Sequence, residues 1–174
     1  MDGGGATFLI GDDRIWTYRD LEEFAAVWKP RLPNGSRPKP ALLRLELSAM
    51  HAMGAAALVR LGIPFAALPS EPGDRLHLAA EREFPHAADL TGSLMQAWAE
   101  WEHGAGRRSR DGQPFGFADS TEPAFWLFTS GSTGEPKCVP VSPRQIRAAA
   151  EAARAVFMPR SGGAWLLALP PHHA

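Results

Sequence analysis

The stretch AFWLFTSGSTGEPK, residues 124–137, decides the fold of this 174-residue sequence. Its first five residues are apolar and aromatic, which is typical of a buried strand. The strand runs directly into Thr129–Lys137, where hydroxyl side chains alternate with glycines ahead of a proline and a lysine. The sequence therefore predicts a strand that ends in a polar, glycine-containing loop.

This loop has the composition of a site for a polyphosphate. Its four hydroxyl side chains can donate hydrogen bonds to phosphate oxygens. Its two glycines let the backbone turn tightly, so that amide N–H groups face the same anion. Lys137 adds a mobile positive charge, and Pro136 prevents a helix from continuing there. We therefore predict that phosphate is bound by Thr129, Ser130, Gly131, Ser132, Thr133, Gly134 and Lys137.

Two other interpretations of the loop are weaker. A Walker P-loop needs the pattern G-x-x-x-x-G-K-[ST] at the start of a helix. Here Glu135 and Pro136 separate the second glycine from the lysine, and strand-like residues 138–141 follow. A surface turn rich in serine and glycine would explain a shorter motif, but it does not explain the whole string behind an aromatic strand.

Upstream of this stretch, candidate strands alternate with candidate helices. A hairpin over Thr7–Tyr18 is expected to turn at residues 11–13, and Thr17 is the expected N-cap of the first helix, with Asp20 completing an imperfect capping box. The apolar stripe of that helix is Leu21, Phe24, Ala25 and Trp28. The later candidates are strands at 41–47, 63–68 and 87–90 and helices at 48–62, 74–83 and 93–101. This order predicts an α/β fold in which helices cover a parallel sheet.

Residues 103–116 contain almost no apolar side chains, and we interpret them as an exposed connector.

Beyond the loop, Ser142 and Gln145 have the spacing of a capping box at the start of another helix. The apolar stripe of this helix is expected to pack on the sheet, and a buried strand is expected at Ala164–Leu169. The stripe consists of Ile146, Ala149, Ala150, Ala153 and Val156.

The overall composition excludes several classes of protein. The formal net charge is −1, so no global field favours nucleic acid or an anionic membrane. Hydrophobic residues make up 45% of the sequence, enough for a core, but no apolar run is long enough to cross a membrane. Cys138 is the only cysteine, so no internal disulfide is expected. The first residues lack the pattern of a signal peptide, and we expect a soluble cytoplasmic protein.

The string from Phe128 to Lys137 resembles the signature loop of the adenylate-forming superfamily, [YF]-T-S-G-[ST]-T-G-x-P-K-G, with Cys138 in place of the final glycine. Two weaker matches lie upstream in the same order as in that family, at Trp16–Leu21 and Leu61–Pro69. The superfamily includes acyl-CoA synthetases, luciferases and the adenylation domains of peptide synthetases. We expect Cys138 to be a small packed thiol rather than a catalytic one.

The resemblance implies a layered α/β sandwich, which is the fold of the N-terminal domain of these enzymes. Residues 1–120 would then form the first α/β subdomain, with the connector near its end. Residues 121–174 would contain the phosphate-binding loop and begin a second subdomain with a second sheet. The C-terminal domain of the family has no counterpart in this sequence, so we expect a fragment that is inactive without the remainder of its own chain.

The last residues indicate a branch of the superfamily. His172 and His173 follow the segment W-L-L-A-L-P, which looks most like that of o-succinylbenzoate–CoA ligases of menaquinone biosynthesis. This resemblance implies a ligase that uses ATP and Mg²⁺ to form an acyl-adenylate and then a thioester of coenzyme A. It assigns catalysis to Lys137, a hydroxyl contact near Mg²⁺ to Thr133, and the acyl pocket to His173 and His172.

Two alternatives stay open at this point. The first is another adenylate-forming enzyme, such as an aryl- or fatty-acyl-CoA ligase or a peptide-synthetase adenylation domain. The second is a module that binds nucleotide phosphates without chemistry. For the ligase, the expected partners are ATP, coenzyme A and a small carboxylic acid. Neither nucleic acid nor a membrane is expected, and the sequence leaves open whether a homo-oligomer forms.

Overall fold

A computed structural model describes residues 7–11, 14–33, 39–71, 75–105, 120–129, 134–157 and 167–168. The elements are, in chain order, β1 (Thr7–Ile10), β2 (Ile15–Thr17), α1 (Tyr18–Trp28), a 3-10 turn (Lys29–Arg31), β3 (Ala41–Leu45), α2 (Ala49–Leu61), β4 (Phe65–Pro69), α3 (Arg75–Glu83), α4 (Thr91–Glu100), a wide helical turn (Trp101–Ala105), β5 (Phe125–Thr129), β6 (Lys137–Val141) and α5 (Pro143–Phe157). This order confirms the predicted α/β class. Among these helices, none is long and apolar enough to cross a bilayer.

Four strands form one mixed sheet in the order β3-β4-β5-β6. β3, β4 and β5 are parallel, which confirms the predicted arrangement for these three strands. β6 is antiparallel to β5, because the short link between Thr129 and Lys137 leaves no room for a crossover helix. We expected a second sheet to begin after residue 120, but β5 and β6 instead extend the first sheet.

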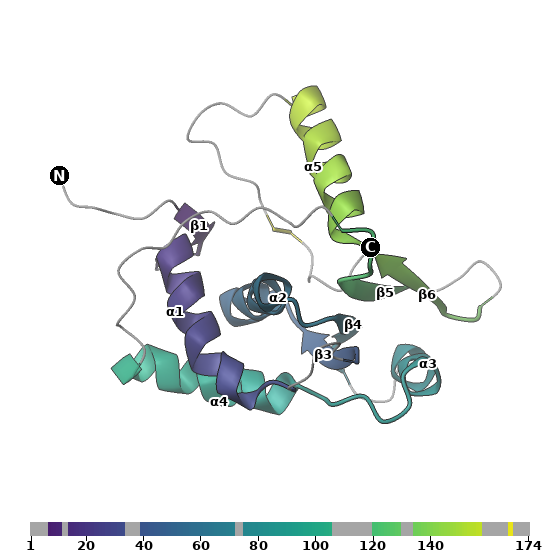
Figure 1. Ribbon diagram of the computed structural model, residues 1–174, viewed down its shortest axis with the longest axis horizontal. Helices are drawn as coiled ribbons and strands as arrows, with labels where there is room; N and C mark the ends of the chain where they lie inside the picture. Colours follow the sequence, from purple (N-terminus) through teal and green to yellow (C-terminus); the bar gives the residue numbers. More distant parts are fainter. Residues whose placement is uncertain are drawn as a thin grey trace.

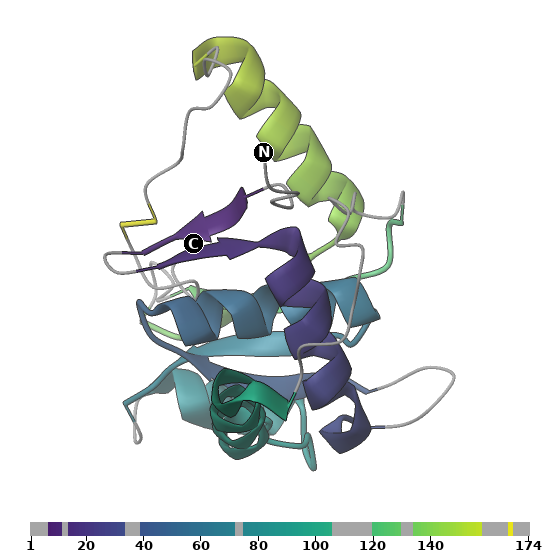
Figure 2. The ribbon, with the colours of Figure 1, turned by 90° about the vertical axis from the view of Figure 1, so that its left-hand side faces the viewer.

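Helices cover both faces of this sheet, and each face has its own core (Figure 1). Successive side chains of a strand point to opposite faces. Phe65 of β4 accordingly belongs to the core formed with α1, α2 and α4, whereas Leu68 belongs to the core formed with α3. α1 packs on α2 and α4 rather than directly on the sheet. Figure 2 shows the β1–β2 hairpin leading into the start of α1.

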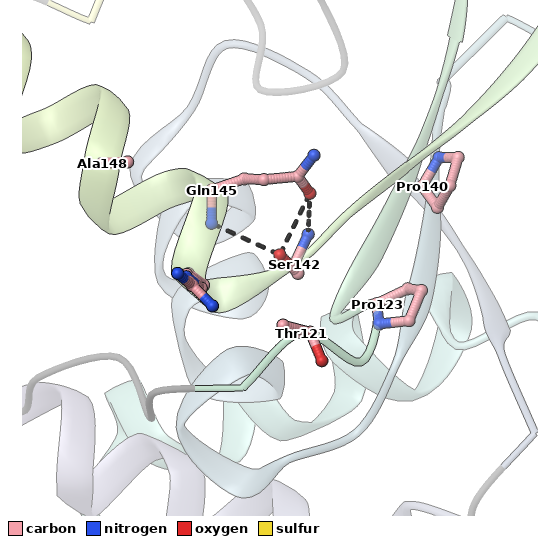
Figure 3. A pocket seen from close by; sticks show the side chains of 7 residues that line it. Thr121, Pro123, Pro140, Ser142, Gln145 and Ala148 are labelled. Atoms are coloured by element: carbon pink, nitrogen blue, oxygen red, sulfur yellow. Dashed lines mark hydrogen bonds between the residues drawn. The ribbon is translucent and has the colours of Figure 1, made fainter.

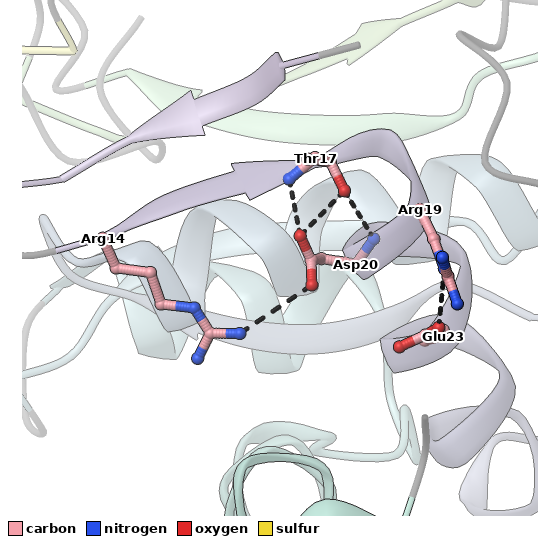
Figure 4. Close-up of polar contacts among 5 residues, drawn as sticks. All are labelled: Arg14, Thr17, Arg19, Asp20 and Glu23. Carbon is pink, nitrogen blue, oxygen red and sulfur yellow. Dashed lines mark hydrogen bonds and ion pairs between the residues drawn. The ribbon is translucent and has the colours of Figure 1, made fainter. Parts of the chain in front are cut away.

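The chain enters α1 through the β1–β2 hairpin, which is antiparallel as predicted. Thr17 is the N-cap of α1, and its hydroxyl accepts a hydrogen bond from the N–H of Asp20 at 3.2 Å. The Asp20 carboxylate accepts one from the N–H of Thr17 at 2.7 Å, which completes the capping box (Figure 4). Arg14 lies 3.8 Å from the same carboxylate, and Arg19 contacts Glu23 at 3.1 Å. These contacts fix the first turn of α1.

An aromatic cluster joins α1 to α4 and the turn that follows α4. The apolar stripe predicted for α1 is buried, as expected. Phe24 is fully buried, and its ring lies edge-to-face with Trp98 at 5.5 Å and with Trp101 at 5.8 Å between centroids. Trp28 is tilted against Phe24 at 5.8 Å, and its indole N–H donates a hydrogen bond to the Ser93 hydroxyl at 3.0 Å. The two helices are thus joined by both packing and a partly buried hydrogen bond.

α2 begins and ends where its sequence predicts. The Ser48 hydroxyl accepts a hydrogen bond from the N–H of His51, and Gly62 ends the helix with a φ of 68°. In the middle of α2, Gly54 faces Leu94 of α4, and a Cβ at this position would lie only 2.8 Å from a Leu94 methyl carbon. The absence of a side chain therefore lets the two helices approach closely.

One predicted strand does not form, and another lies mostly outside the described residues. Residues 87–90 make a single bridge, between Asp89 and Leu42, instead of a strand. In the expected buried strand Ala164–Leu169, only residues 167–168 are described, and both are exposed and outside any strand. The rest of that segment lies outside the described residues, as does most of the expected connector after the turn that ends at residue 105.

The expectation that the apolar stripe of α5 packs on the sheet is wrong for the described residues. Val156 is 74% exposed, Ala149 and Ala150 are exposed, and Ile146 and Ala153 are only half-buried. The two faces of the sheet are already covered by the other helices, and α5 projects away from the sheet (Figure 1). The periodicity of α5 predicts a helix, but it does not determine which surface covers that helix.

Candidate phosphate-binding site

The predicted phosphate-binding loop begins and ends on neighbouring strands. Thr129 is the last residue of β5, and Lys137 is the first residue of β6. The two are paired in the antiparallel ladder, next to the pair of Phe128 and Cys138. Gly134, on the lysine side of the loop, has a φ of 80°, which favours glycine. The sheet therefore brings the first and last residues of the predicted site side by side.

Several predicted site residues lie outside the described part of the chain, so their assignments stay predictions. Among the residues that are described, no group of three or more His, Cys, Asp or Glu side chains could hold a metal ion. The predicted contact near Mg²⁺ is also untested, because Thr133 lies outside the described residues. The undescribed site residues are Ser130, Gly131, Ser132, Thr133, His172 and His173.

Phe128 holds the end of β5 in the core immediately before the loop. Its side chain is only 6% exposed and belongs to the apolar cluster between the sheet and α3, together with Leu68 and Ala80. The ring of Phe84, which follows α3, lies edge-to-face with it at 6.5 Å between centroids. Because Phe128 is anchored in this way, the backbone of Thr129 leaves the sheet from a fixed position.

Lys137 is available to an anion. Its side chain is exposed. Within the part of the chain that the structure describes, its ammonium forms neither a hydrogen bond nor an ion pair. An ammonium carries three donors on a flexible stem, and it can reach a phosphate in several geometries. Thr129, which is half-buried, pairs with Lys137 on the neighbouring strand and supplies a hydroxyl donor. Together they form a donor set suited to phosphate.

Cys138, the residue that departs from the signature, is a half-buried thiol packed against the α3 side of the sheet. Burial, and secondarily the negative charge of Glu83, raise the pKa of this thiol to about 11. A nucleophilic cysteine needs a lowered pKa, because the thiolate is the reactive form. The environment of Cys138 therefore supports a packed thiol rather than a catalytic one.

Alkylation of native Cys138 by iodoacetamide at pH 8 is expected to be at least about tenfold slower than that of an ordinary cysteine, whose pKa is about 8.5. The rate is expected to rise with pH until the pH passes the raised pKa of about 11. Mass spectrometry of timed samples would measure it. The same chain unfolded in urea is the control and should react at the ordinary rate. An equal rate in the native chain would contradict the packed environment.

The structure also identifies a residue that the sequence analysis did not single out. His77 of α3 is 8% exposed, and neither of its ring nitrogens has a hydrogen-bond partner within the described residues. The sequence signal was weak, because a histidine three residues before Ala80 also fits the buried face of an ordinary helix.

A cavity of about 540 Å³ lies at the opposite end of β5 and β6 from the loop (Figure 3). The groups that line it are Thr121, Pro123, Pro140, Ser142, Arg144, Gln145 and Ala148. Ser142 and Gln145 already form hydrogen bonds with each other in the predicted capping box, at 2.8–3.3 Å. The N–H of Arg144 donates to the carbonyl of Ser120. This cavity is therefore separate from the predicted phosphate loop, and it presents few unpaired groups for a ligand.

Comparison with known structures shows the same fold in adenylate-forming enzymes. One is o-succinylbenzoate coenzyme A synthetase from Bacillus subtilis in complex with AMP, with a TM-score of 0.71, 16% identity, and coverage of 97% of this chain and 47% of that chain. A malonyl-CoA ligase with methylmalonyl-CoA and AMP bound has a TM-score of 0.57 and 18% identity over 86% of this chain and 32% of that chain. The N-terminal subdomain of Klebsiella oxytoca NpsA has a TM-score of 0.53 and 21% identity over 80% of this chain and 38% of that chain.

These identities support a shared fold and not a shared substrate. The chain spans less than half the length of each of these three structures. No curated protein matches the sequence. A family model described as "AMP-binding enzyme" matches residues 42–174, which run from within β3 through α5 and include the candidate loop. Since this match covers most of the sequence, the chain belongs to the family of AMP-binding enzymes.

Proposed function

We propose that the protein activates a carboxylic acid with ATP and then transfers the acyl group to coenzyme A. In the first step, a carboxylate oxygen attacks the α-phosphorus of ATP, the bond to the β-phosphate oxygen breaks, and pyrophosphate leaves. In the second step, the sulfur of coenzyme A attacks the acyl carbon, the thiol proton is released, and AMP leaves. The observation that carries the proposal is the signature loop between the paired residues Thr129 and Lys137, in a chain of the AMP-binding family.

The residues of the loop have the chemistry that this first step requires. Negative charge grows on the oxygens of the departing pyrophosphate, and a prepositioned cation and hydroxyl donors lower the energy of that state. Lys137 would supply the cation, and the loop hydroxyls would orient the β- and γ-phosphates. The one carboxylate of the loop, that of Glu135, is exposed. Bound Mg²⁺ would add positive charge, and Thr133 is the hydroxyl that we propose near it.

The proposed acid is o-succinylbenzoate, and the proposed location is the cytoplasm. Support for the acid comes from the sequence, because His172 and His173 follow an apolar segment like that of the o-succinylbenzoate–CoA ligases. His173, with His172 beside it, would shape the acyl pocket and would not act as a base, since a carboxylate is already deprotonated at pH 7. We also propose that residues 1–120 and 121–174 belong to two subdomains of the N-terminal domain that share the sheet, since β5 and β6 continue the sheet formed by β3 and β4.

The test is release of pyrophosphate from ATP by the full-length product of the gene that encodes this chain, across a panel of carboxylic acids. Activity with o-succinylbenzoate, together with formation of its CoA thioester, is the expected result. The panel should include malonate, aryl acids, fatty acids and amino acids, with each reaction repeated without coenzyme A. Pyrophosphate release should persist without coenzyme A at a reduced turnover, because adenylation precedes thioester formation.

The other outcomes separate the parts of the proposal. Activity only with a different acid would leave adenylation in place and reject o-succinylbenzoate as the substrate. Adenylation without any thioester would favour an enzyme that passes its acyl group to a carrier other than coenzyme A. A folded protein that binds ATP but releases no pyrophosphate with any acid would instead be a nucleotide-binding module.

A further inference from the structure

α5 carries an apolar stripe that no described part of the protein buries. Pro143, in the first turn, is the only buried residue among the 15 residues of this helix. At the other end of α5, Val156 is 74% exposed and Phe157 is 67% exposed. Contiguous apolar surface of this kind marks an interaction site. The stripe, whose members recur at helical spacing, consists of Ile146, Ala149, Ala150, Ala153 and Val156.

A helix of this length is expected to need a packing surface. Isolated helices of about 12–15 residues are only marginally stable in water, and most helices in proteins are stabilised by packing of their apolar face. α5 is anchored at its start, where Ser142 and Gln145 form the capping box and the N–H of Arg144 donates to the carbonyl of Ser120 at 3.1 Å. The remaining turns project away from the sheet (Figure 1). These contacts hold the first turn and leave the stripe open.

The chemistry of the stripe defines the surface that fits it. Arg144 and Glu151 are exposed and lie on the opposite side of the helix, where they can stay in water. The stripe itself has no charged side chain, so its partner is apolar. Three of its five side chains are single methyl groups, which let another helix or a strand approach closely.

The size of the stripe distinguishes a segment of the same chain from a second copy of the protein. A helix of 15 residues is about 22 Å long and about 10 Å wide, so its stripe presents a few hundred square ångströms. A standard interface between two proteins buries about 800 Å² on each partner. Association of two chains also costs translational and rotational freedom, which a segment of the same chain does not lose again. The stripe therefore suits packing within one chain.

The lengths of the similar structures indicate that such a segment exists. The Bacillus subtilis o-succinylbenzoate coenzyme A synthetase covers 97% of this chain, but only 47% of that chain is matched. For the malonyl-CoA ligase the matched share is 32%. The AMP-binding family model continues to residue 174, which is the last residue of this sequence. More than half of each similar chain therefore has no counterpart in the 174 residues.

We propose that the apolar stripe of α5 is an interface within the full-length protein, covered by the part of the same chain that follows residue 174. The inference concerns the assembly of the domain and does not depend on the proposed reaction. It has a consequence for the candidate site, because α5 follows directly on β6, the edge strand that begins with Lys137. A covered α5 would hold this edge strand from the side that β5 does not pair.

The test compares two positions of α5 in the full-length product of the gene. Ala149 lies on the stripe, and Ala155, six residues later, lies about 240° further around the helix, on the opposite side. Both alanines are exposed in the present structure, so they form a matched pair. Ala149→Cys and Ala155→Cys are alkylated with iodoacetamide, and mass spectrometry resolves each new thiol from Cys138. The same variants unfolded in urea give the reference rates.

In the native protein, the thiol of Ala149→Cys should react at least about 100-fold more slowly than that of Ala155→Cys, because the interface must open before the reagent enters. The two rates should be equal in urea, and the native difference should not change on dilution. A second pair measures stability. Ala149→Glu should lower the melting temperature by about 5 °C or more, since it buries an unpaired charge, whereas Ala155→Glu should change it by less than about 2 °C.

Three results would overturn the inference. Equal alkylation of the two thiols in the native protein would mean that the stripe stays uncovered. Protection of Ala149→Cys that disappears on dilution would identify a second copy as the partner. A gene product that ends at residue 174 would lack the proposed segment. None of these measurements uses ATP, so release of pyrophosphate by the same preparations tests the proposed function separately.

Discussion

Replacing Lys137 with alanine is expected to slow pyrophosphate release by the full-length gene product by about 10²- to 10³-fold, the usual cost of removing one group that stabilises transition-state charge. The ammonium has no competing partner among the described residues, so its charge is free to act on a bound anion. Its backbone is fixed by pairing with Thr129. The effect should therefore appear mainly in kcat, with a smaller rise in KM for ATP.

The control for this prediction is Lys39→Ala, which removes the same charge from an exposed position outside the site. Its rate should stay within about twofold of the wild type, because a single exposed charge contributes little at physiological salt. A second variant, Lys137→Arg, keeps the charge but changes the shape of the donor, and it should recover only part of the rate. Equal rates for Lys137→Ala and the wild type would reject the assignment of Lys137.

Local rules predicted the elements that carry the loop. The spacing of Thr17 and Asp20, and that of Ser142 and Gln145, predicted two helix starts, and both capping boxes are present. Hydrophobic runs predicted β3, β4 and β5, and Gly62 predicted the end of α2. These features depend on residues that are close in the sequence, so a single chain contains the information needed to infer them.

Long-range packing was harder to predict. The direction of β6 depends on how the chain returns after the loop. The apolar stripe of α5 does not show which other part of the protein, if any, packs against it. His77 was missed for a similar reason. Its ring nitrogens are buried without a partner among the described residues, a three-dimensional property that the pattern of α3 does not reveal.

The candidate site stays a prediction, although the strands that carry its two ends are observed. The string from Phe128 to Lys137 predicted a phosphate loop, and pairing across the sheet brings Thr129 and Lys137 together. The acyl-pocket assignment of His172 and His173 stays a prediction, since it rests on resemblance alone. Phe128, the aromatic residue at which the string begins, is buried and anchors the strand from which the loop starts.

The largest expected loss of stability comes from Phe24→Ala. Phe24 is fully buried between α1 and α4, and its ring contacts those of Trp28, Trp98 and Trp101 at centroid distances of 5.5–5.8 Å. Truncation would remove this apolar surface from the core and leave a cavity surrounded by large indole rings, which cannot collapse into it without leaving their own contacts. We expect a cost of about 3–5 kcal/mol in the free energy of unfolding.

Urea unfolding followed by tryptophan fluorescence would measure this cost, because three of the reporting indoles surround the site. Phe24→Leu should cost less than Phe24→Ala, since it keeps most of the volume and loses the edge-to-face contacts, worth about 0.5–1.5 kcal/mol for an aromatic pair. Leu78→Ala is the exposed control, at 52% exposure, and it should change stability by less than about 0.5 kcal/mol. If Phe24→Ala were as mild as Leu78→Ala, α1 and α4 would not be joined by this cluster.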